Sequence, residues 1–232
     1  MAVPTRAEAL TLLLSTHPSE RLLQHVTVVA EVAAFLAHRA LRAGLSVDRR
    51  LVETAGLLHD VDKALPADDP IRELGHGAAG AAWLSAAGHA ELARPIAAHP
   101  VMQLDQPGAL EWLARAPLED RIVCYADKRA TQRVVSLEQR FARWVRKHPE
   151  YAERLGSTLV LAQRLEADIC TSLGIQPEDV ERLPWVADAV ARAKAANGLT
   201  SHGKEPPPVT EPSAPPLVAS AGRQRLGPPS AA

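Results

Sequence analysis

Apolar residues recur at helical spacing in the first quarter of the chain. From Leu22 to Leu36 they fall three or four positions apart, which places them on one face of a helix. Ser19 is a residue type that caps helix starts, and Gly44 is typical of the position just after a helix end. The pattern therefore predicts an amphipathic helix over about 20–43.

A shorter apolar stripe follows and leads to two polar residues. Asp48 can cap a helix over about 49–60, whose apolar positions again share one face. This helix ends in His59 and Asp60, and Pro66 breaks the chain soon after. A histidine and a carboxylate are therefore delivered together at a helix end.

The rest of the chain continues the helical pattern. Further helices are predicted over 5–15, 78–87, 91–98, 109–115, 118–131, 136–147, 149–173 and 178–196, with loops at 64–75 and 100–108. We expect the first of these loops to lie over the region of His59 and Asp60. No segment has a convincing strand pattern, and no internal repeat is found. The fold class predicted is all-α, as a compact helical bundle.

The composition changes near residue 198. Eight of the 19 prolines lie between Pro206 and Pro229, mixed with Ser, Ala and Gly. Such a segment cannot bury enough apolar surface to offset the entropy lost on ordering. We therefore expect a helical domain over 1–197, with its core at about 20–145, and a disordered tail over 198–232.

Composition and charge narrow the class of protein. Apolar residues make up 47% of the chain and aromatics only 3%, which favours packed helices. The net charge of −1 gives no field that would attract nucleic acid or an anionic membrane. Two cysteines, Cys124 and Cys170, do not form a disulfide framework, and no signal-peptide core or membrane-spanning run is found. These features predict a soluble cytoplasmic protein, and they leave a homodimer open.

Six residues on separate predicted helices or helix ends are candidate metal ligands: His25, His59, Asp60, His76, His99 and Asp127. Adjacent residues on a helix point about 100° apart. His59 and Asp60 can therefore bracket a metal site, with the two oxygens of Asp60 bridging two ions. For His25 taken alone, a core histidine with a satisfied hydrogen bond would be the better interpretation.

The order His25, His59-Asp60, Asp127 resembles the HD superfamily of metal-dependent phosphohydrolases. The resemblance covers about residues 20–145, and the additional His76 and His99 resemble the subset that binds two metals. Within the superfamily the chain looks most similar to small stand-alone bacterial HD proteins, including the YqeK-like diadenosine tetraphosphate hydrolases. That group also has an arginine six residues after the last aspartate, where Arg133 stands.

The chain also departs from the patterns of particular HD branches. Arg129-Ala130-Thr131 stands where the YqeK-like proteins usually have Glu-Pro, and Pro100-Val101 follows His99 instead of threonines. No Gly-Tyr-Pro follows His99, which argues against the cyclic-di-GMP phosphodiesterases. The resemblance therefore implies the fold and the metal site and leaves the substrate open.

What the resemblance implies is hydrolysis of a phosphoester or phosphoanhydride bond by a metal-activated water. The expected cofactor is a divalent transition metal, as two ions of Fe, Mn, Ni, Co or Zn. Asp60, Lys63 and Asp62 are the expected catalytic residues, with Asp62 orienting water. Lys63, Lys128 and Arg133 are expected to bind a small phosphorylated substrate, such as a nucleotide.

Two other interpretations stay open at the level of the sequence. An HD fold could hold metal and nucleotide without turnover, as a sensor or partner module, and the proline-rich segment motivates this alternative. Each candidate residue also has a structural interpretation: His76 at a helix start, His99 as a helix terminator, and Lys63 in a salt bridge to Asp68 or Asp69. Arg129, Arg133 and Arg140 could instead form a solvated face, which is the alternative to substrate binding by Lys128 and Arg133.

Overall fold

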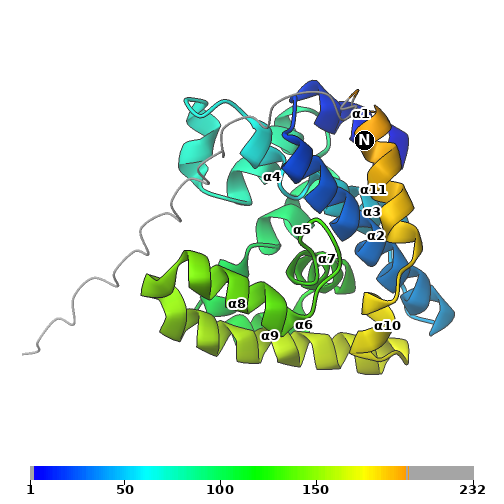
Figure 1. Cartoon of the computed structure of the whole chain (residues 1–232), viewed down its shortest axis with the longest axis vertical. Helices are drawn as coiled ribbons and strands as arrows, with labels where there is room; N and C mark the ends of the chain where they lie inside the picture. The colour runs from blue at the N-terminus through cyan, green and yellow to red at the C-terminus, as the bar shows by residue number, and fades with distance from the viewer. Residues whose placement is uncertain (1–2, 197, 199–232) are drawn as a thin grey trace, which may run out of the picture. The chain divides into compact units, whose positions relative to one another are not determined.

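The computed structural model describes residues 3–196 and 198, and the described chain is helical without a β-strand (Figure 1). The all-α prediction is confirmed. The α-helices are α1 Arg6–Ser15, α2 Glu20–Arg42, α3 Arg49–Leu58, α4 Ala78–Ala86, α5 Ala93–Ala98, α6 Ala109–Arg115, α7 Leu118–Lys128, α8 Leu137–Lys147, α9 Ala152–Leu173, α10 Pro177–Glu181 and α11 Trp185–Ala196. Short 3₁₀ helices are η1 Val61–Ala64, η2 Pro70–Leu74, η3 Ala90–Leu92, η4 Val101–Asp105 and η5 Pro149–Tyr151.

The described residues form one compact unit by their contacts. The predicted disordered tail falls, apart from Gly198, outside the described residues, so that prediction stays a prediction. None of the described helices combines the length and the apolar character needed to cross a membrane.

Helices α2 and α3 pack closely against each other, and a glycine allows this. The hydroxyl of Ser19 accepts a hydrogen bond from the Leu22 amide and starts α2 as predicted. In α3, a Cβ added to Gly56 would lie only 3.1 Å from the Cα of Ala30. A larger residue at Gly56 would therefore push α3 away from α2, and with it the histidine at the end of α3.

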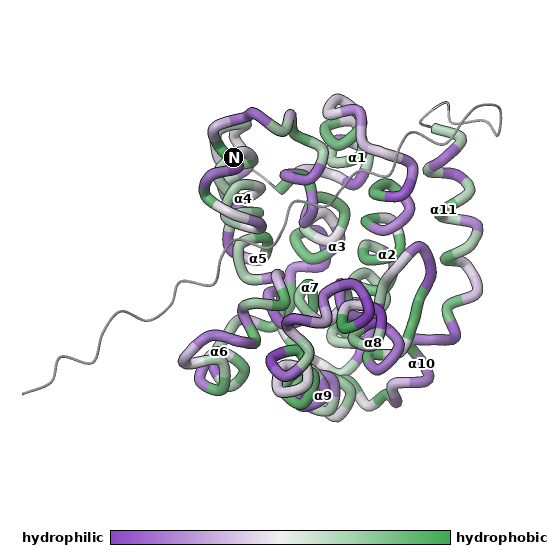
Figure 2. The backbone as a smooth tube through the Cα atoms, turned by 60° about the vertical axis from the view of Figure 1, so that its left-hand side comes forward, coloured by the Kyte–Doolittle hydropathy of each residue, from purple (hydrophilic) through white to green (hydrophobic). Residues whose placement is uncertain are grey.

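Helix α7 lies among the other helices in both views (Figures 1 and 2). It packs against α2, α3 and α5 on one side and against α9 on another. Its apolar residues Ile122, Val123, Cys124 and Ala126 are completely buried. Burial of apolar side chains on several faces of one helix stabilises the packing around it, so the end of α7 is held at a defined place beside α2 and α3.

Several predicted helix boundaries are wrong, including those of 49–60, which ends at Leu58, and of 91–98, which begins with the 3₁₀ helix η3. The helix predicted over 118–131 ends at Lys128, because the following residues form a turn in which Ala130 bridges to Val134. The helix predicted over 178–196 is two helices, since Pro184 cannot continue the first one. The segment predicted over 149–173 begins with a 3₁₀ turn before α9. The predicted loops at 64–75 and 100–108 likewise contain 3₁₀ turns.

Candidate metal centre

Four of the predicted ligands meet at one point, and we name them the first ligand group: His25, His59, Asp60 and Asp127. The Nε2 atom of His25 lies 3.4 Å from Asp60 Oδ2 and 3.2 Å from Asp127 Oδ1. The Nε2 atom of His59 lies 3.4 Å and 3.7 Å from the same two oxygens. Helix α2, the end of α3 and the end of α7 supply these side chains, and 102 positions separate His25 from Asp127 in the chain.

A second ligand group shares Asp60 with the first and adds His76 and His99. The other oxygen of Asp60, Oδ1, lies 3.4 Å from His76 Nε2 and 3.5 Å from His99 Nε2. The two imidazole Nε2 atoms are 3.0 Å apart. Asp60 Oδ1 is buried and accepts no hydrogen bond from the described residues. Asp60 thus stands between the two groups and offers one oxygen to each, as a bridging carboxylate would.

Backbone carbonyls hold three of the four histidines in one tautomer. The Nδ1 atom of His59 is 2.8 Å from the Gly56 carbonyl, and that of His99 is 2.6 Å from the Ile96 carbonyl. The Nδ1 atom of His25 is 3.3 Å from the Thr131 carbonyl. A carbonyl can only accept, so each Nδ1 donates its hydrogen. The lone pair of each neutral ring is therefore on Nε2, which faces the other ligands.

Two neutral rings in this arrangement would bring their lone pairs together, so a proton or a metal ion between them stabilises the centre. His59 Nε2 and His25 Nε2 are 3.3 Å apart, and neither nitrogen can donate to the other when both rings are neutral. Donor atoms that share one ion at about 2.0–2.2 Å lie roughly 3 to 3.5 Å apart, close to the separations in both groups. The donors are imidazole and carboxylate, which suit divalent transition metals. The residues therefore fit metal ions, and which metal and how many ions are left to experiment.

Burial and neighbouring charges shift the pKa values of these side chains. Burial lowers the pKa of His99 to about 3, so its ring stays neutral. Burial would also lower the pKa of His59, but the Asp60 and Asp127 carboxylates outweigh it and raise that pKa to about 9. Burial opposes ionisation of both carboxyls, yet neighbouring His59 and Lys63 hold the pKa of Asp60 well below its usual value. Lys128 and His25 do the same for the pKa of Asp127.

Asp62 contacts the predicted ligand His76 and belongs to neither ligand group. Its Oδ2 atom accepts a hydrogen bond from His76 Nδ1 at 2.9 Å, which directs His76 Nε2 toward Asp60. This is the usual position of a carboxylate that orients a metal-bound histidine. The geometry thus assigns Asp62 a role in positioning His76, whereas the sequence suggested that it orients water.

Of the three predicted substrate-binding cations, two are accessible. Lys63 donates a hydrogen bond to Asp60 Oδ2 at 2.9 Å, and its side chain is 34% exposed. Arg133 is exposed in the turn after α7. Lys128 is completely buried, and its ammonium donates to the His99 carbonyl and to Asp127. Lys128 therefore contacts two of the predicted ligands, His99 and Asp127, and the structure does not favour its predicted contact with substrate.

The sequence patterns missed Arg140 of α8. One of its terminal nitrogens lies 3.5 Å from Asp127 Oδ1, so a charge from a separate helix reaches the first ligand group. No spacing rule links Arg140 to Asp127, because the contact depends on how α8 folds back over the end of α7. Only the assembled helices reveal it.

Comparison with known proteins assigns a family to the segment that contains this centre. The family model of the HD domain matches residues 22–132, a segment that contains all six ligands. Searches of curated proteins and of solved structures found no match. The similarity to YqeK-like proteins thus stays a prediction, whereas the ligand order, the helical fold and the family match agree: over residues 22–132 the chain belongs to the HD-domain family.

Proposed function

We propose that this protein is a metal-dependent phosphohydrolase that cleaves a phosphoester or phosphoanhydride bond of a small phosphorylated substrate, such as a nucleotide. The observation that carries the proposal is the placement of Asp60, which offers one oxygen to each of two histidine groups. Divalent ions bound there would supply activation of a water molecule and neutralisation of phosphate charge.

The side chains around the ligands have complementary tasks. Asp60, His59 and His99 are almost completely buried, whereas His76 and Lys63 have side chains 32% and 34% exposed. Substrate therefore reaches the centre from the side of His76 and Lys63. The ammonium of Lys63 can follow the charge that develops on phosphate oxygens, because its flexible stem lets it turn from Asp60 toward substrate. A small phosphorylated end suits this access better than a long polymer, since the ligands behind it are enclosed.

The test is an assay of the full chain loaded in turn with Mn, Fe, Co, Ni or Zn. The panel contains a generic phosphoester, nucleotides and dinucleoside polyphosphates, and metal content is measured in the same samples. We expect turnover of at least one substrate that stops when metal is removed and returns when it is restored. Inactivity on the whole panel with metal bound would contradict the proposal, and tight nucleotide binding without turnover would favour the sensor alternative.

A further inference from the structure

Two arginines stand near Asp127, and they differ in what satisfies their hydrogen-bond donors. Arg129 is fully buried, but its donors bond the Val135 carbonyl at 2.8 Å, the Tyr125 hydroxyl at 2.8 Å and Glu181 at 3.0 Å. It also contacts Glu166. Arg129 is thus a structural residue whose guanidinium is already saturated.

Arg140 is mostly buried and is not satisfied in this way. Its side chain is 14% exposed, and its buried Nε atom has no hydrogen-bond partner among the described residues. The 3.5 Å approach of a terminal nitrogen to Asp127 brings the charges together without the geometry of a hydrogen bond. A buried N–H group without a hydrogen bond is costly, so the position of this Nε atom requires an explanation.

The guanidinium of Arg140 lies over an aromatic ring of its own helix. The guanidinium carbon is 4.4 Å from the centre of the Trp144 ring, one helical turn further along α8. Trp144 in turn packs edge-on against the buried Phe141, with ring centres 4.9 Å apart. Contact with a ring face uses none of the N–H donors of the guanidinium. A planar fork suits a group with two oxygens, such as a phosphate.

Pairing with Asp127 alone does not account for Arg140. Asp127 Oδ2 already accepts from Lys128 at 3.3 Å, and Oδ1 lies 3.2 Å from His25. The Lys128 ammonium therefore already offsets the charge of this carboxylate. Arg140 adds charge beside the centre, and its unpartnered Nε is a donor that a phosphate would take up.

We propose that Arg140 binds a phosphate oxygen of the substrate at the Asp127 edge of the first ligand group, while Lys63 acts at the Asp60 edge. The inference rests on the proposed function for its substrate and extends it: the ligand is a phosphate group with at least two free oxygens. Arg140 lies beyond the residues that match the HD-domain family, so this contact belongs to the part of the chain outside that match.

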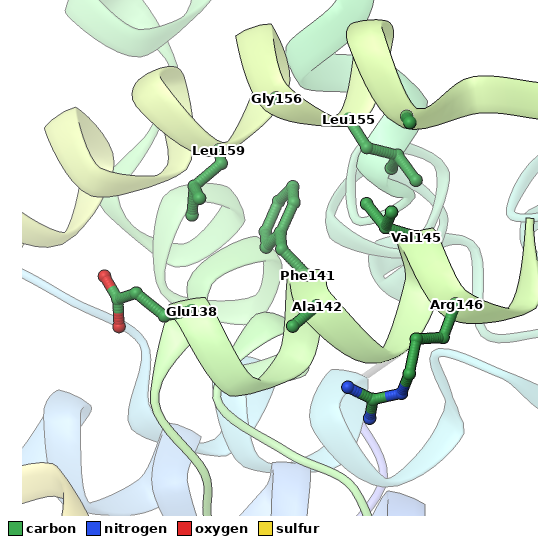
Figure 3. Close-up of a pocket in the computed structure, with 9 residues that line it drawn as sticks. Glu138, Phe141, Ala142, Val145, Arg146, Leu155, Gly156 and Leu159 are labelled. Carbon is green, nitrogen blue, oxygen red and sulfur yellow. The ribbon is translucent and has the colours of Figure 1, made fainter. Parts of the chain in front are cut away.

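The experiment measures binding of inorganic phosphate to the full chain loaded with Mn, together with metal content and hydrolysis. Variants are R140Q, R140K and the control R146Q. Arg146 stands on the same helix but borders the apolar groove between α8 and α9, with its side chain directed away from Phe141 (Figure 3). We expect R140Q to bind phosphate at least about tenfold more weakly, as for loss of a charged hydrogen bond, with metal content unchanged.

R140K should bind phosphate with intermediate affinity, because an ammonium keeps the charge but loses the planar fork. R146Q should bind phosphate as the wild type does. Wild-type affinity in R140Q, or a loss of metal that matches the loss of phosphate binding, would overturn the inference. If R140Q does not fold, wild-type affinity in R140K overturns it. The proposed function fails separately if the wild-type protein hydrolyses nothing while its phosphate binding still depends on Arg140.

Discussion

At the scale of single residues, Asp60 is the side chain that the two ligand groups share. Asp60 places Oδ2 beside His25 and His59, and Oδ1 beside His76 and His99. Removal of a histidine from one group leaves the other group intact, whereas removal of Asp60 damages both. The two kinds of variant therefore differ in metal content as well as in activity.

We expect Asp60→Asn to lose bound metal at both groups and to lower activity by about a thousandfold or more, since metal assistance supplies several kcal/mol. His99→Gln should keep metal at the first ligand group and lose it at the second. Elemental analysis of the purified variants, with circular dichroism as a check on folding, measures the difference. Equal metal content in the two variants would contradict a bridging Asp60.

The Asp62–His76 contact gives a second prediction at this scale. Asp62→Asn keeps the shape of the side chain but removes the charge that orients the His76 ring. We expect the affinity of the second ligand group for metal to fall about 10- to 100-fold, as for other residues that orient a ligand. Metal titration followed by calorimetry measures this, and Asp68→Asn, at an exposed position, is the matched control. An unchanged metal affinity would return Asp62 to the predicted role of orienting water.

At the scale of elements, the turn between α7 and α8 links the fold to the centre. The Thr131 carbonyl in this turn accepts from His25, and Arg129 holds the turn through the Val135 carbonyl. Arg129 also ties α7 to α9 through Glu166 and to α10 through Glu181. One buried guanidinium thus fixes both the turn and the helices around it.

Arg129→Met should therefore destabilise the protein strongly. It leaves Glu166 and the Tyr125 hydroxyl without their charged partner, at a cost of about 3–5 kcal/mol. For a chain of this size the melting temperature should fall by roughly 10 °C. Arg115→Met is the control, because Arg115 pairs with Glu111 on the surface and such pairs contribute little. Equal melting temperatures for the two variants would contradict the structural role of Arg129.

At the scale of the whole molecule, metal binding and folding are coupled. Ligands from α2, the end of α3, the end of α7 and the segments around α4 and α5 meet only when the helices are packed. A metal that binds the folded state alone stabilises it by about 2.7 kcal/mol at 100 times its Kd. A metal bound at this centre would therefore hold these helices together.

The stabilisation by metal should increase with pH. Without metal, His59 carries a proton up to a pKa of about 9, and this proton must leave before Nε2 can bind an ion. The metal-bound state holds fewer protons, so rising pH favours it. We expect Mn to raise the melting temperature more at pH 8 than at pH 6, as followed by scanning calorimetry. Equal shifts at the two pH values would show that His59 does not lose a proton on binding.

The sequence sufficed for the helical class and for the six ligand candidates. Helical periodicity is a local property, and the motif around His59-Asp60 carries its chemistry in adjacent residues. The family match and the fold confirmed these predictions of class and family. The roles of individual residues stay predictions until they are measured.

Tertiary packing decided what local patterns could not. The surface interpretation of Arg140 and the substrate role of Lys128 were both reasonable along the chain, yet the first contacts Asp127 and the second is enclosed. The end of α7 at Lys128 also depends on the turn that follows it, in which Ala130 bridges to Val134. The physical reason is that the burial of a side chain and its distance from other charges depend on which helices pack together. The close approach of α3 to α2 at Gly56 is one such contact, and it exists only in the folded chain.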